Sequence, residues 1–442
     1  MSSKKKTAAT KEEATPALVP KLRFPEFREA EAWKGTSLNA IADPVTERAN
    51  QGEENTILSL SAEHGLVLQS EFFGKKVAGD NSERYMKIAR NDFVYNDRTT
   101  KASTFGTIKR LSKHSGGIVS PIYKCFRFQG DQNPVFWDWY FESGSHTKAL
   151  AGLVNEGARA GRFNISITQF LSTVAWRPGK SEQQKIAECL STVDEVIAAQ
   201  AWKLHGLKAH KKGLMQQLFP GEGETQPHLR FREFQDKGEW EETPLSKFIL
   251  SLDAGVSVNA GERPASEAEF GVLKTSAITK GRFDPEENKE VLIKEEQFRL
   301  KEPVTAGTII ICRKNTPALV GSNAYVESTH KNLFLPDLLW AAKPREGVSM
   351  RFLAFILSSD KGRAALSKMA KGSSTSMINI TKPEVLAFRV MAPSLEEQRR
   401  IAACLSTLDD LIVADAQKLE ALNTHKRGLM QQLFLSAKGI ES

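Results

Sequence analysis

Loops with the side-chain types that contact nucleic acid occur in both halves of the sequence. The segment from Arg84 to Lys113 contains eight lysine or arginine residues and only two acidic residues. Within it, the loop that begins at Asn96 follows a predicted strand and offers an amide, a guanidinium group and hydroxyl groups. Such groups hydrogen-bond base edges and phosphates in the major groove of DNA. The pattern favours a polyanionic ligand, although any one of these side chains is equally compatible with a solvated surface.

The second half of the chain repeats this pattern. A loop that begins at Arg313 follows another predicted strand, and Gly- and Ser-rich segments around Arg159 and Lys371 precede two related triplets. The triplets are Asn164-Ile165-Ser166 and Asn379-Ile380-Thr381, and we interpret each as a turn into a strand. The candidate DNA-binding residues are Asn96, Arg98, Thr99, Lys101, Lys109, Arg110, Arg159, Arg162, Arg313, Lys314, Asn315, Thr316, Lys371, Ser373 and Ser374.

Most of these loops belong to, or follow, two regions whose sequences differ, here called the inserts. Between Ile57 and Phe128, and between Val256 and Ala341, short β-type runs alternate with Gly and Asn. The segments Asp92 to Tyr95 and Thr308 to Ile311 are predicted to occupy the same strand in each insert, and a helix is predicted after each insert. We therefore predict two small, mixed, strand-rich domains.

The sequence around the inserts, here called the frame, is duplicated. The stretch from Glu182 to Phe219 recurs from Glu397 to Phe434 at an offset of about 215 residues, with about 24 of 38 residues identical. The segment LRFPEF from Leu22 matches LRFREF from Leu229 at an offset of about 207 residues. The chain is thus built twice, and a repeated frame with unlike inserts suggests common assembly with separate recognition.

Each repeated stretch lacks proline and is predicted to form one long helix. Apolar residues alternate at three- and four-residue steps, the a/d pattern of a coiled coil. Such a helix is about 57 Å long, and we expect the two helices to pair in antiparallel orientation with one insert domain near each end. The lysines at 203, 211, 418 and 426 are interpreted as a solvated face, with partner docking as the alternative. The predicted seam consists of Ile186, Leu190, Val193, Ile197, Leu204, Leu207, Leu214, Leu218, Ile401, Leu405, Leu408, Ile412, Leu419, Leu422, Leu429 and Leu433.

Composition limits the class of protein. With 442 residues, a net charge of +8 and a pI near 9.1, the chain can form two or three domains and favours, without requiring, polyanionic partners. The four cysteines show no CxxC and no histidine at ligand spacing, so neither a zinc site nor a disulfide framework is indicated. No apolar run approaches the roughly 18 residues of a membrane span, and the basic start lacks the apolar stretch of a signal peptide. We expect a cytoplasmic protein that does not contact membranes.

The sequence lacks the motifs of two classes of enzyme that act on DNA. An adenine methyltransferase needs an aromatic-flanked Pro-Pro motif to hold a flipped base, and the sequence contains no Pro-Pro. A nucleotide-driven motor needs GxxxxGK[ST], and Gly179-Lys180-Ser181 lacks the upstream glycine. We therefore expect no catalytic residues, and the chain is interpreted as a binding scaffold.

The doubled frame resembles the specificity subunit of type I restriction-modification systems. The resemblance covers Leu22 to Leu435 and rests on the PKLRFPEF and HLRFREF openings, the EQxxIAxxL pattern after a proline in both halves, and the KKGLMQQLF and KRGLMQQLF endings. It implies two target recognition domains that read a bipartite, gapped sequence in double-stranded DNA, with helical spacers of fixed length. It also implies a non-catalytic chain that docks two methyltransferase subunits for adenine N6 methylation and two ATP-dependent motor and endonuclease subunits. S-adenosylmethionine, ATP and Mg²⁺ would then belong to the partners, with no cofactor or metal in this chain.

The resemblance and the repeats together predict an α+β fold of two pseudo-symmetric halves. Each half is a mixed strand-rich target recognition domain followed by a long helix, and the two helices pair as an antiparallel coiled coil. The predicted division is a disordered basic tail at 1–19, the first recognition domain at 20–180, a central spacer helix at 181–220, a linker at 221–228, the second recognition domain at 229–395, a C-terminal spacer helix at 396–435 and a tail at 436–442.

Two other classes of function stay open. One is a structural adaptor whose helices recruit proteins and whose inserts bind peptides; it predicts no salt-dependent affinity for duplex DNA, whereas DNA recognition predicts a steep salt slope. The other is a self-sufficient nuclease built on Asp284 and Glu287-Asn288-Lys289, which lie in a stretch of alternating charges that is also typical of a solvated surface. The nuclease requires magnesium-dependent cleavage by the purified chain.

Overall fold

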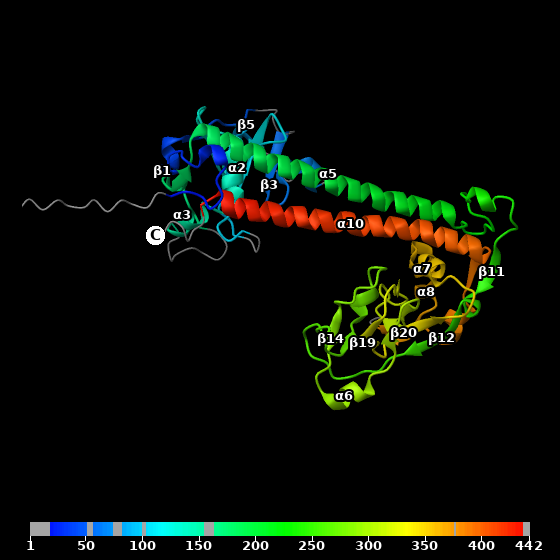
Figure 1. Ribbon diagram of the computed structural model, residues 1–442. Coiled ribbons are helices and arrows are strands. Elements are labelled where there is room, and N and C mark those ends of the chain that lie inside the picture. Colours follow the sequence, from blue (N-terminus) through cyan, green and yellow to red (C-terminus); the bar gives the residue numbers. More distant parts are fainter. Residues whose placement is uncertain are drawn as a thin grey trace, which may run out of the picture. The chain divides into compact units, whose positions relative to one another are not determined.

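The computed structural model describes residues 18–50, 56–73, 82–99, 103–153, 163–374 and 377–435, and these form two compact units. The first unit combines the chain up to Trp202 with the chain from Gln417 onward, and the second runs from Lys203 to Ala416. Two long helices contribute to both units (Figure 1), α5 (Lys180–Leu218) and α10 (Leu395–Leu433). Their bounds lie within two residues of the spacer helices predicted from the sequence. The predicted tail at 436–442 and most of that at 1–19 lie outside the described residues.

The long helices pair in antiparallel orientation within each unit. In the first unit Lys426 of α10 contacts Asp194 of α5 at 2.5 Å, and in the second Lys211 of α5 contacts Asp409 of α10 at 2.5 Å. Each of the sixteen predicted seam residues is buried or half-buried. The predicted coiled coil is confirmed, because the apolar a/d stripe lies between the helices.

The lysines of the predicted solvated face have different environments. Lys211 and Lys426 occupy the seam positions that the apolar pattern skips, three residues before Leu214 and Leu429, and their side chains are each 20% exposed. The interpretation of a solvated face is therefore wrong for these two residues. It overlooked that a lysine can bury its apolar stem in a seam while its ammonium group reaches a carboxylate.

Each unit contains two four-stranded sheets with the same strand order. In the first unit the orders are β2 (Ala42–Pro44), β9 (Lys124–Phe128), β6 (Phe93–Asn96), β7 (Thr107–Arg110) and β4 (Gly65–Leu68), β3 (Ile57–Ser61), β8 (Gly116–Val119), β5 (Met86–Ala89). In the second they are β12 (Ile249–Ala254), β20 (Leu339–Pro344), β16 (Ile309–Cys312), β18 (Asn323–Tyr325) and β14 (Asn288–Glu290), β13 (Gly271–Leu273), β19 (His330–Phe334), β15 (Pro303–Val304).

The two inserts therefore share one topology although their sequences differ. The central pair of the second sheet is parallel in both units, β3 with β8 and β13 with β19, and the other pairs in these sheets are antiparallel. The strands β6 and β16 hold the same place, which is the correspondence predicted from the sequence. Because pleated strands need only alternating apolar residues and turn residues in the right places, different sequences can satisfy the same pairing.

Further helices and short strands, some in the frame and some in the inserts, complete each unit. Those of the first unit are β1 (Lys34–Ser37) paired with β10 (Val174–Arg177), α1 (Gln69–Phe73), α2 (Pro134–Glu142), α3 (Thr147–Ala151) and α4 (Ile167–Leu171). Those of the second unit are β11 (Glu241–Pro244) paired with β23 (Arg389–Ala392), α6 (Lys294–Arg299), α7 (Met350–Ser358), α8 (Asp360–Lys368) and α9 (Lys382–Ala387).

The ends of the long helices belong to the cores of the units. In the first unit the aromatic core around Trp33 and Trp137 includes Phe434, whose ring centroid lies 6.2 Å from that of Trp33. In the second unit Phe219 lies 6.3 Å from Trp240 in the same way. Each unit thus packs the beginning of one long helix and the end of the other against the same apolar surface.

A buried ion pair fastens each frame opening to a long helix. Arg23 contacts Glu182 at 2.7 Å, and Arg230 contacts Glu397 at 2.7 Å, with all four side chains at most 10% exposed. Each guanidinium group also donates to two backbone carbonyl groups of its own segment, Ala30 and Glu31 for Arg23. Hydrogen bonding to Glu182 raises the pKa of Arg23, so the guanidinium group stays charged.

The repeated triplets lead into helices, and the interpretation of a turn into a strand is wrong. Ser166 caps α4 and Thr381 caps α9, each in a capping box with the residue three positions later, Gln169 or Glu384. The signal was present in the sequence, since Ser or Thr followed three residues later by Gln or Glu is a typical helix start.

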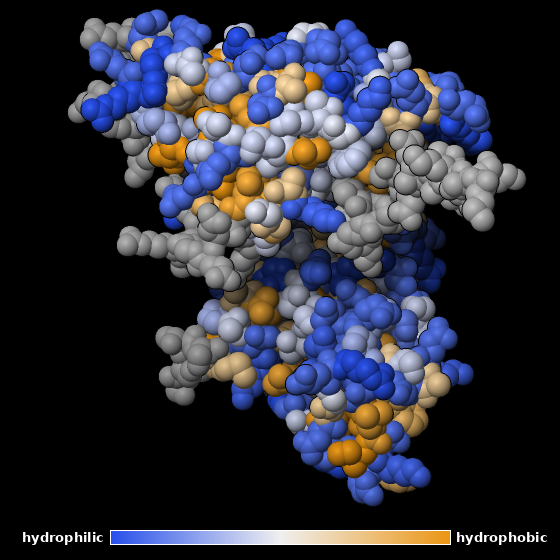
Figure 2. Space-filling model, turned by 90° about the vertical axis from the view of Figure 1, so that its left-hand side faces the viewer, coloured by the Kyte–Doolittle hydropathy of each residue, from blue (hydrophilic) through white to orange (hydrophobic). Residues whose placement is uncertain are grey.

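Figure 2 shows one face of the molecule, on which hydrophilic residues predominate and apolar residues form separate groups. A few large apolar side chains are exposed in the second unit, of which Phe298, at 89%, is exposed the most. Within the described part of the chain, no helix combines the length and the apolarity that a membrane crossing requires.

The buried frame ion pair generates a stability prediction. Arg23→Ala leaves the carboxylate of Glu182 buried without its cation, so we expect the free energy of unfolding to fall by about 3–5 kcal/mol. The matched control is Lys34→Ala, because Lys34 and its partner Glu31 are 73% and 81% exposed; it should cost less than about 1 kcal/mol. Urea denaturation of both variants measures the difference, and equal losses would contradict a special role for the buried pair.

The inter-helix ion pairs generate a second prediction. Lys211→Asp places two carboxylates together in the half-buried seam and should destabilise the second unit, whereas adding Asp409→Lys should recover most of the loss. The coupling between the two substitutions is expected to be about 0.5–3 kcal/mol. Thermal unfolding of the two single variants and the double variant gives this coupling, and additive losses would show that the two side chains act independently.

Candidate nucleic-acid interface

The structure brings the candidates of the second unit together. The loop that leaves β16 continues as β17 (Lys314–Asn315), which pairs with β22 (Met377–Asn379), and β22 pairs with β21 (Lys371–Ser374). A small three-stranded sheet therefore carries five of the seven candidates, and the other two flank β17, with Arg313 directly before it and Thr316 directly after it. The side chains of Ser373 and Ser374 lie outside the described structure. This grouping joins two segments that the sequence treated as separate loops.

In the first unit the corresponding loop leaves β6. Asn96 ends the strand and pairs with Thr107, and the Oδ1 atom of Asn96 accepts a hydrogen bond from the backbone N–H of Arg98 at 3.2 Å. Thr99 is half-buried. The candidates Lys101, Arg159 and Arg162 lie outside the described residues.

Two basic candidates of the first unit face acidic residues of α2. Lys109 contacts Glu142 at 2.6 Å, and Arg110 contacts Asp138 at 3.0 Å and also donates to Asn91. Their side chains are only 19% and 14% exposed. The structure therefore uses these charges to hold the sheet against the helix, which leaves them little freedom to contact a ligand.

Two basic candidates of the second unit are also engaged. The Nε atom of Arg313 donates to the backbone carbonyl of Asp337 at 2.5 Å, and its guanidinium group lies 3.7 Å from the Asp337 carboxylate. Lys371 contacts Glu384 at 2.7 Å. Lys371 and Thr381 together lower the pKa of Glu384 to about 2, so the carboxylate is charged at neutral pH.

The two remaining described cations differ from these four. Arg98 and Lys314 are exposed, and neither side chain forms a hydrogen bond or ion pair with another described residue. Asn315 resembles Asn96 in using its amide oxygen within the loop, because it accepts from the backbone N–H of Thr316 at 2.8 Å. Among the described candidates, the interface thus combines shaped loops with one unengaged cation in each unit.

The sequence analysis did not indicate the charge contacts that hold the base of each loop, between Asp97 and Lys124 and between Arg313 and Asp337. Asp97, which is completely buried, contacts Lys124 on β9 at 2.7 Å, and Asp337 holds Arg313. Both partners lie more than twenty residues away in the sequence, on a neighbouring strand or just before one. No local pattern marks such a contact; only correct strand pairing would have found it.

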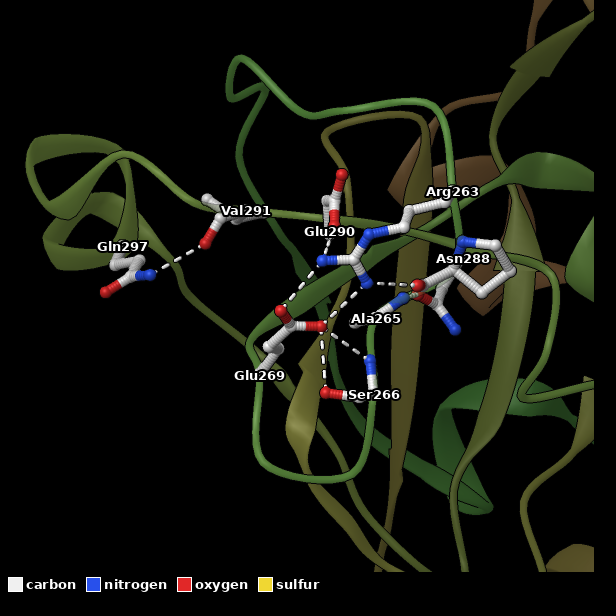
Figure 3. A network of polar contacts seen from close by, with 9 residues as sticks. Arg263, Ala265, Ser266, Glu269, Asn288, Glu290, Val291 and Gln297 are labelled. Carbon is white, nitrogen blue, oxygen red and sulfur yellow. Dashed lines mark hydrogen bonds and ion pairs between the residues drawn. The ribbon is translucent and has the colours of Figure 1, made fainter.

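A polar network also stabilises the loop that follows β12, and no sequence pattern indicated it. Arg263 contacts both Glu269 and Glu290 (Figure 3), and Glu269 accepts hydrogen bonds from Ser266. Arg263 lowers the pKa of Glu269 to about 2. The buried Asn288 of β14 accepts from the backbone N–H of Ala265 at 2.8 Å, so the loop is tied to the edge of its sheet.

The acidic residues of the nuclease alternative have structural partners. Glu287 contacts Lys274 at 3.2 Å and accepts from Ser276 at 2.6 Å, while Asp284 accepts from the backbone N–H of Glu286. Among the described residues, no group of three His, Cys, Asp or Glu side chains lies close enough to hold a metal ion. Nothing in this cluster favours cleavage chemistry.

The fold is that of a type I specificity subunit. The structure is similar to the crystal structure of the S subunit of a type I restriction-modification system from M. genitalium, with a TM-score of 0.58 and 14% identity, over 95% of this chain and 100% of that chain. The predicted α+β fold with two pseudo-symmetric halves is therefore confirmed.

Sequence comparisons point to the same family. Residues 257–424 match the family described as the type I restriction modification DNA specificity domain. The chain is also 28% identical over 273 residues to the type I restriction enzyme MjaVIII specificity subunit of Methanocaldococcus jannaschii. That alignment covers 58% of this chain and 60% of the relative, so the chain spans less than two thirds of the relative's length. The predicted resemblance to this family is confirmed, and residues 257–424 are the part of the chain that matches its DNA specificity domain.

The capping box beside Lys371 generates a local prediction. Thr381→Ala removes the side-chain acceptor for the N–H of Glu384, which should destabilise α9 by about 1 kcal/mol. The amide of Glu384 should then exchange its hydrogen about five-fold faster. Thr407→Ala, on the exposed side of α10, is the control and should leave that exchange rate unchanged. An unchanged rate in Thr381→Ala would show that the cap contributes nothing.

Proposed function

We propose that this chain is the DNA-sequence-recognition subunit of a type I restriction-modification complex. It binds a bipartite, gapped target in double-stranded DNA, with one half-site for each unit, and is itself non-catalytic. The observation that carries the proposal is the pair of inserts with one strand order and unlike sequences, each attached to the same frame. Two sites that share an architecture and differ in surface chemistry suit a partner that presents two different sequences on one regular backbone.

The repeated frame supports the docking of two copies of one partner. The Arg23–Glu182 pair recurs as Arg230–Glu397, and the backbone hydrogen bond from Leu22 to Gln432 recurs from Leu229 to Gln217. A protein that recognises the frame therefore finds the same frame architecture twice. We assign this role to two methyltransferase subunits that modify adenine at N6, and through them to two ATP-dependent translocating endonuclease subunits.

In this proposal the chemistry resides in the partners. The methyltransferase subunits bind S-adenosylmethionine, and the motor and endonuclease subunits bind ATP and Mg²⁺. This chain recognises the target sequence, since its loops carry amide, hydroxyl and cationic groups and its sequence lacks the methyltransferase and motor motifs. A cytoplasmic location follows from the need to reach chromosomal DNA.

A map of N6-methyladenine across the host genome tests the proposal. With the gene present, we expect methylation at a split motif with a constant gap, and deletion of the gene should abolish it. The control is co-expression of the intact gene from a plasmid in the deletion strain, which should restore the same motif. Methylation that persists unchanged after deletion, in cells whose methyltransferase is active, would contradict the proposal and favour the adaptor.

Insert exchange tests the division of labour between the units. Replacing residues 57–128 with another insert of the same strand order should change one half-site and leave the other half-site and the gap unchanged. The matched exchange of residues 256–341 should change only the other half-site. Loss of both half-sites in either correctly folded chimera would show that the units do not read DNA separately.

A further inference from the structure

The six described lysines and arginines among the candidate DNA contacts fall into two groups. Four of them contact an acidic residue of their own unit: Lys109, Arg110, Arg313 and Lys371. The other two, Arg98 and Lys314, are exposed and form no ion pair with the described residues. A cation that already faces a carboxylate attracts a phosphate weakly, because the pair presents little net charge. Among the described candidates, the cation without an acidic partner is thus Arg98 in the first unit and Lys314 in the second.

Arg98 and Lys314 occupy equivalent positions in the two units. The strands β6 and β16 hold the same place in the same sheet order, and each cation lies two residues beyond the last residue of its strand. The carbonyl of the residue between strand and cation also accepts a backbone hydrogen bond near the repeated triplet in both units, from Phe163 for Asp97 and from Ile380 for Arg313. The two donors differ by two positions in the repeat, so the loops lie beside the same part of the frame without sharing every contact.

That intermediate residue is held by a charge contact in both units, with the signs reversed. In the first unit the carboxylate of Asp97 contacts the ammonium group of Lys124, whereas in the second the guanidinium group of Arg313 is held by Asp337. We call this contact the loop clamp. Unlike side chains thus fix the same point of the loop, and in both cases the next residue is an exposed cation.

We propose that Arg98 and Lys314 are equivalent phosphate contacts, one in each unit, which set the position of each insert on the DNA backbone. A rigid loop base beside a free cation suits a phosphate contact, since phosphate positions are the same for every sequence whereas base edges are not. Conservation of the charge at a position where the neighbouring residues differ fits a ligand feature common to both half-sites. The inference rests on the proposed function and adds the residues that align the two units on their target.

The salt dependence of DNA binding tests this inference. The full chain and the variants Arg98→Ala, Lys314→Ala and the double variant are titrated with a labelled duplex that carries the methylated motif, and with a scrambled duplex, between 50 and 200 mM salt. Loss of one phosphate contact should reduce the slope of log affinity against log salt by about 0.9. The advantage of the unsubstituted chain over each single variant should then shrink about 3.5-fold across this salt range, on both duplexes.

Matched variants separate charge from structure. Arg98→Lys and Lys314→Arg keep the charge and should retain the slope of the unsubstituted chain. The exposed frame lysines Lys34 and Lys237 serve as controls, and their replacement by Ala should leave the slope unchanged. Lys109→Ala and Lys371→Ala should reduce it less than Arg98→Ala and Lys314→Ala, because both lysines already have carboxylate partners.

Each of the following outcomes would overturn the inference. Unchanged binding by both alanine variants would remove Arg98 and Lys314 from the interface. A loss confined to the methylated motif, with the slope retained, would make them base-reading residues instead. A loss in only one of the two variants would refute their equivalence. If the unsubstituted chain binds neither duplex while the methylation map shows a motif that depends on the gene, this pair of direct contacts fails although the proposed function stands; if no motif depends on the gene, both fail.

Discussion

The buried ion pair between the arginine of each frame opening and the glutamate of each long helix is the contact on which the two units depend. Arg23 satisfies both oxygens of Glu182 and two carbonyl groups of its own segment, so a single side chain closes a loop and attaches it to α5. The same glutamate accepts from the indole N–H of Trp33. Two charges withdrawn from water are costly unless every polar atom is satisfied, and this arrangement admits very few alternative geometries. The aromatic core, and through it the insert, is therefore built on a defined orientation of the frame against the helix.

Much of the architecture follows from patterns that short stretches of sequence display. The duplication predicts two similar halves. The three- and four-residue spacing of Leu and Ile predicts both the length and the pairing of α5 and α10. Strand positions such as β6 and β16 follow from apolar runs that end in polar loops. The capping boxes at Ser166 and Thr381 are equally visible in the sequence, because Gln169 and Glu384 follow three residues later.

The details of the interface could not be predicted in this way, because they depend on contacts between distant residues. The contact of Arg313 with Asp337, and that of Lys109 with Glu142, require the strand pairing to be known first. The sequence shows a run of basic residues but does not show which of them a carboxylate engages. Likewise, the ammonium group of Lys211 finds Asp409 only once the antiparallel register of the helices is set. The charge composition of the sequence therefore suggests the kind of ligand. The ion pairs of the folded chain show which basic residues have no carboxylate partner and can contact that ligand.

The loop clamp affects whether an insert can keep its loop conformation when it is transferred to another frame. Asp97 and Lys124 both lie within one insert, and Arg313 and Asp337 within the other, so an insert moved to another frame carries its clamp complete. The contacts of Arg110 and Lys109 with α2 are different, since they cross from the insert to the frame. A foreign insert would leave Asp138 and Glu142 facing whatever residues it brings, and burial already raises the pKa of Asp138. A compatible insert would therefore have to supply partners for these two carboxylates as well as rings that fill the places of Phe93, Tyr95 and Phe128 against the frame.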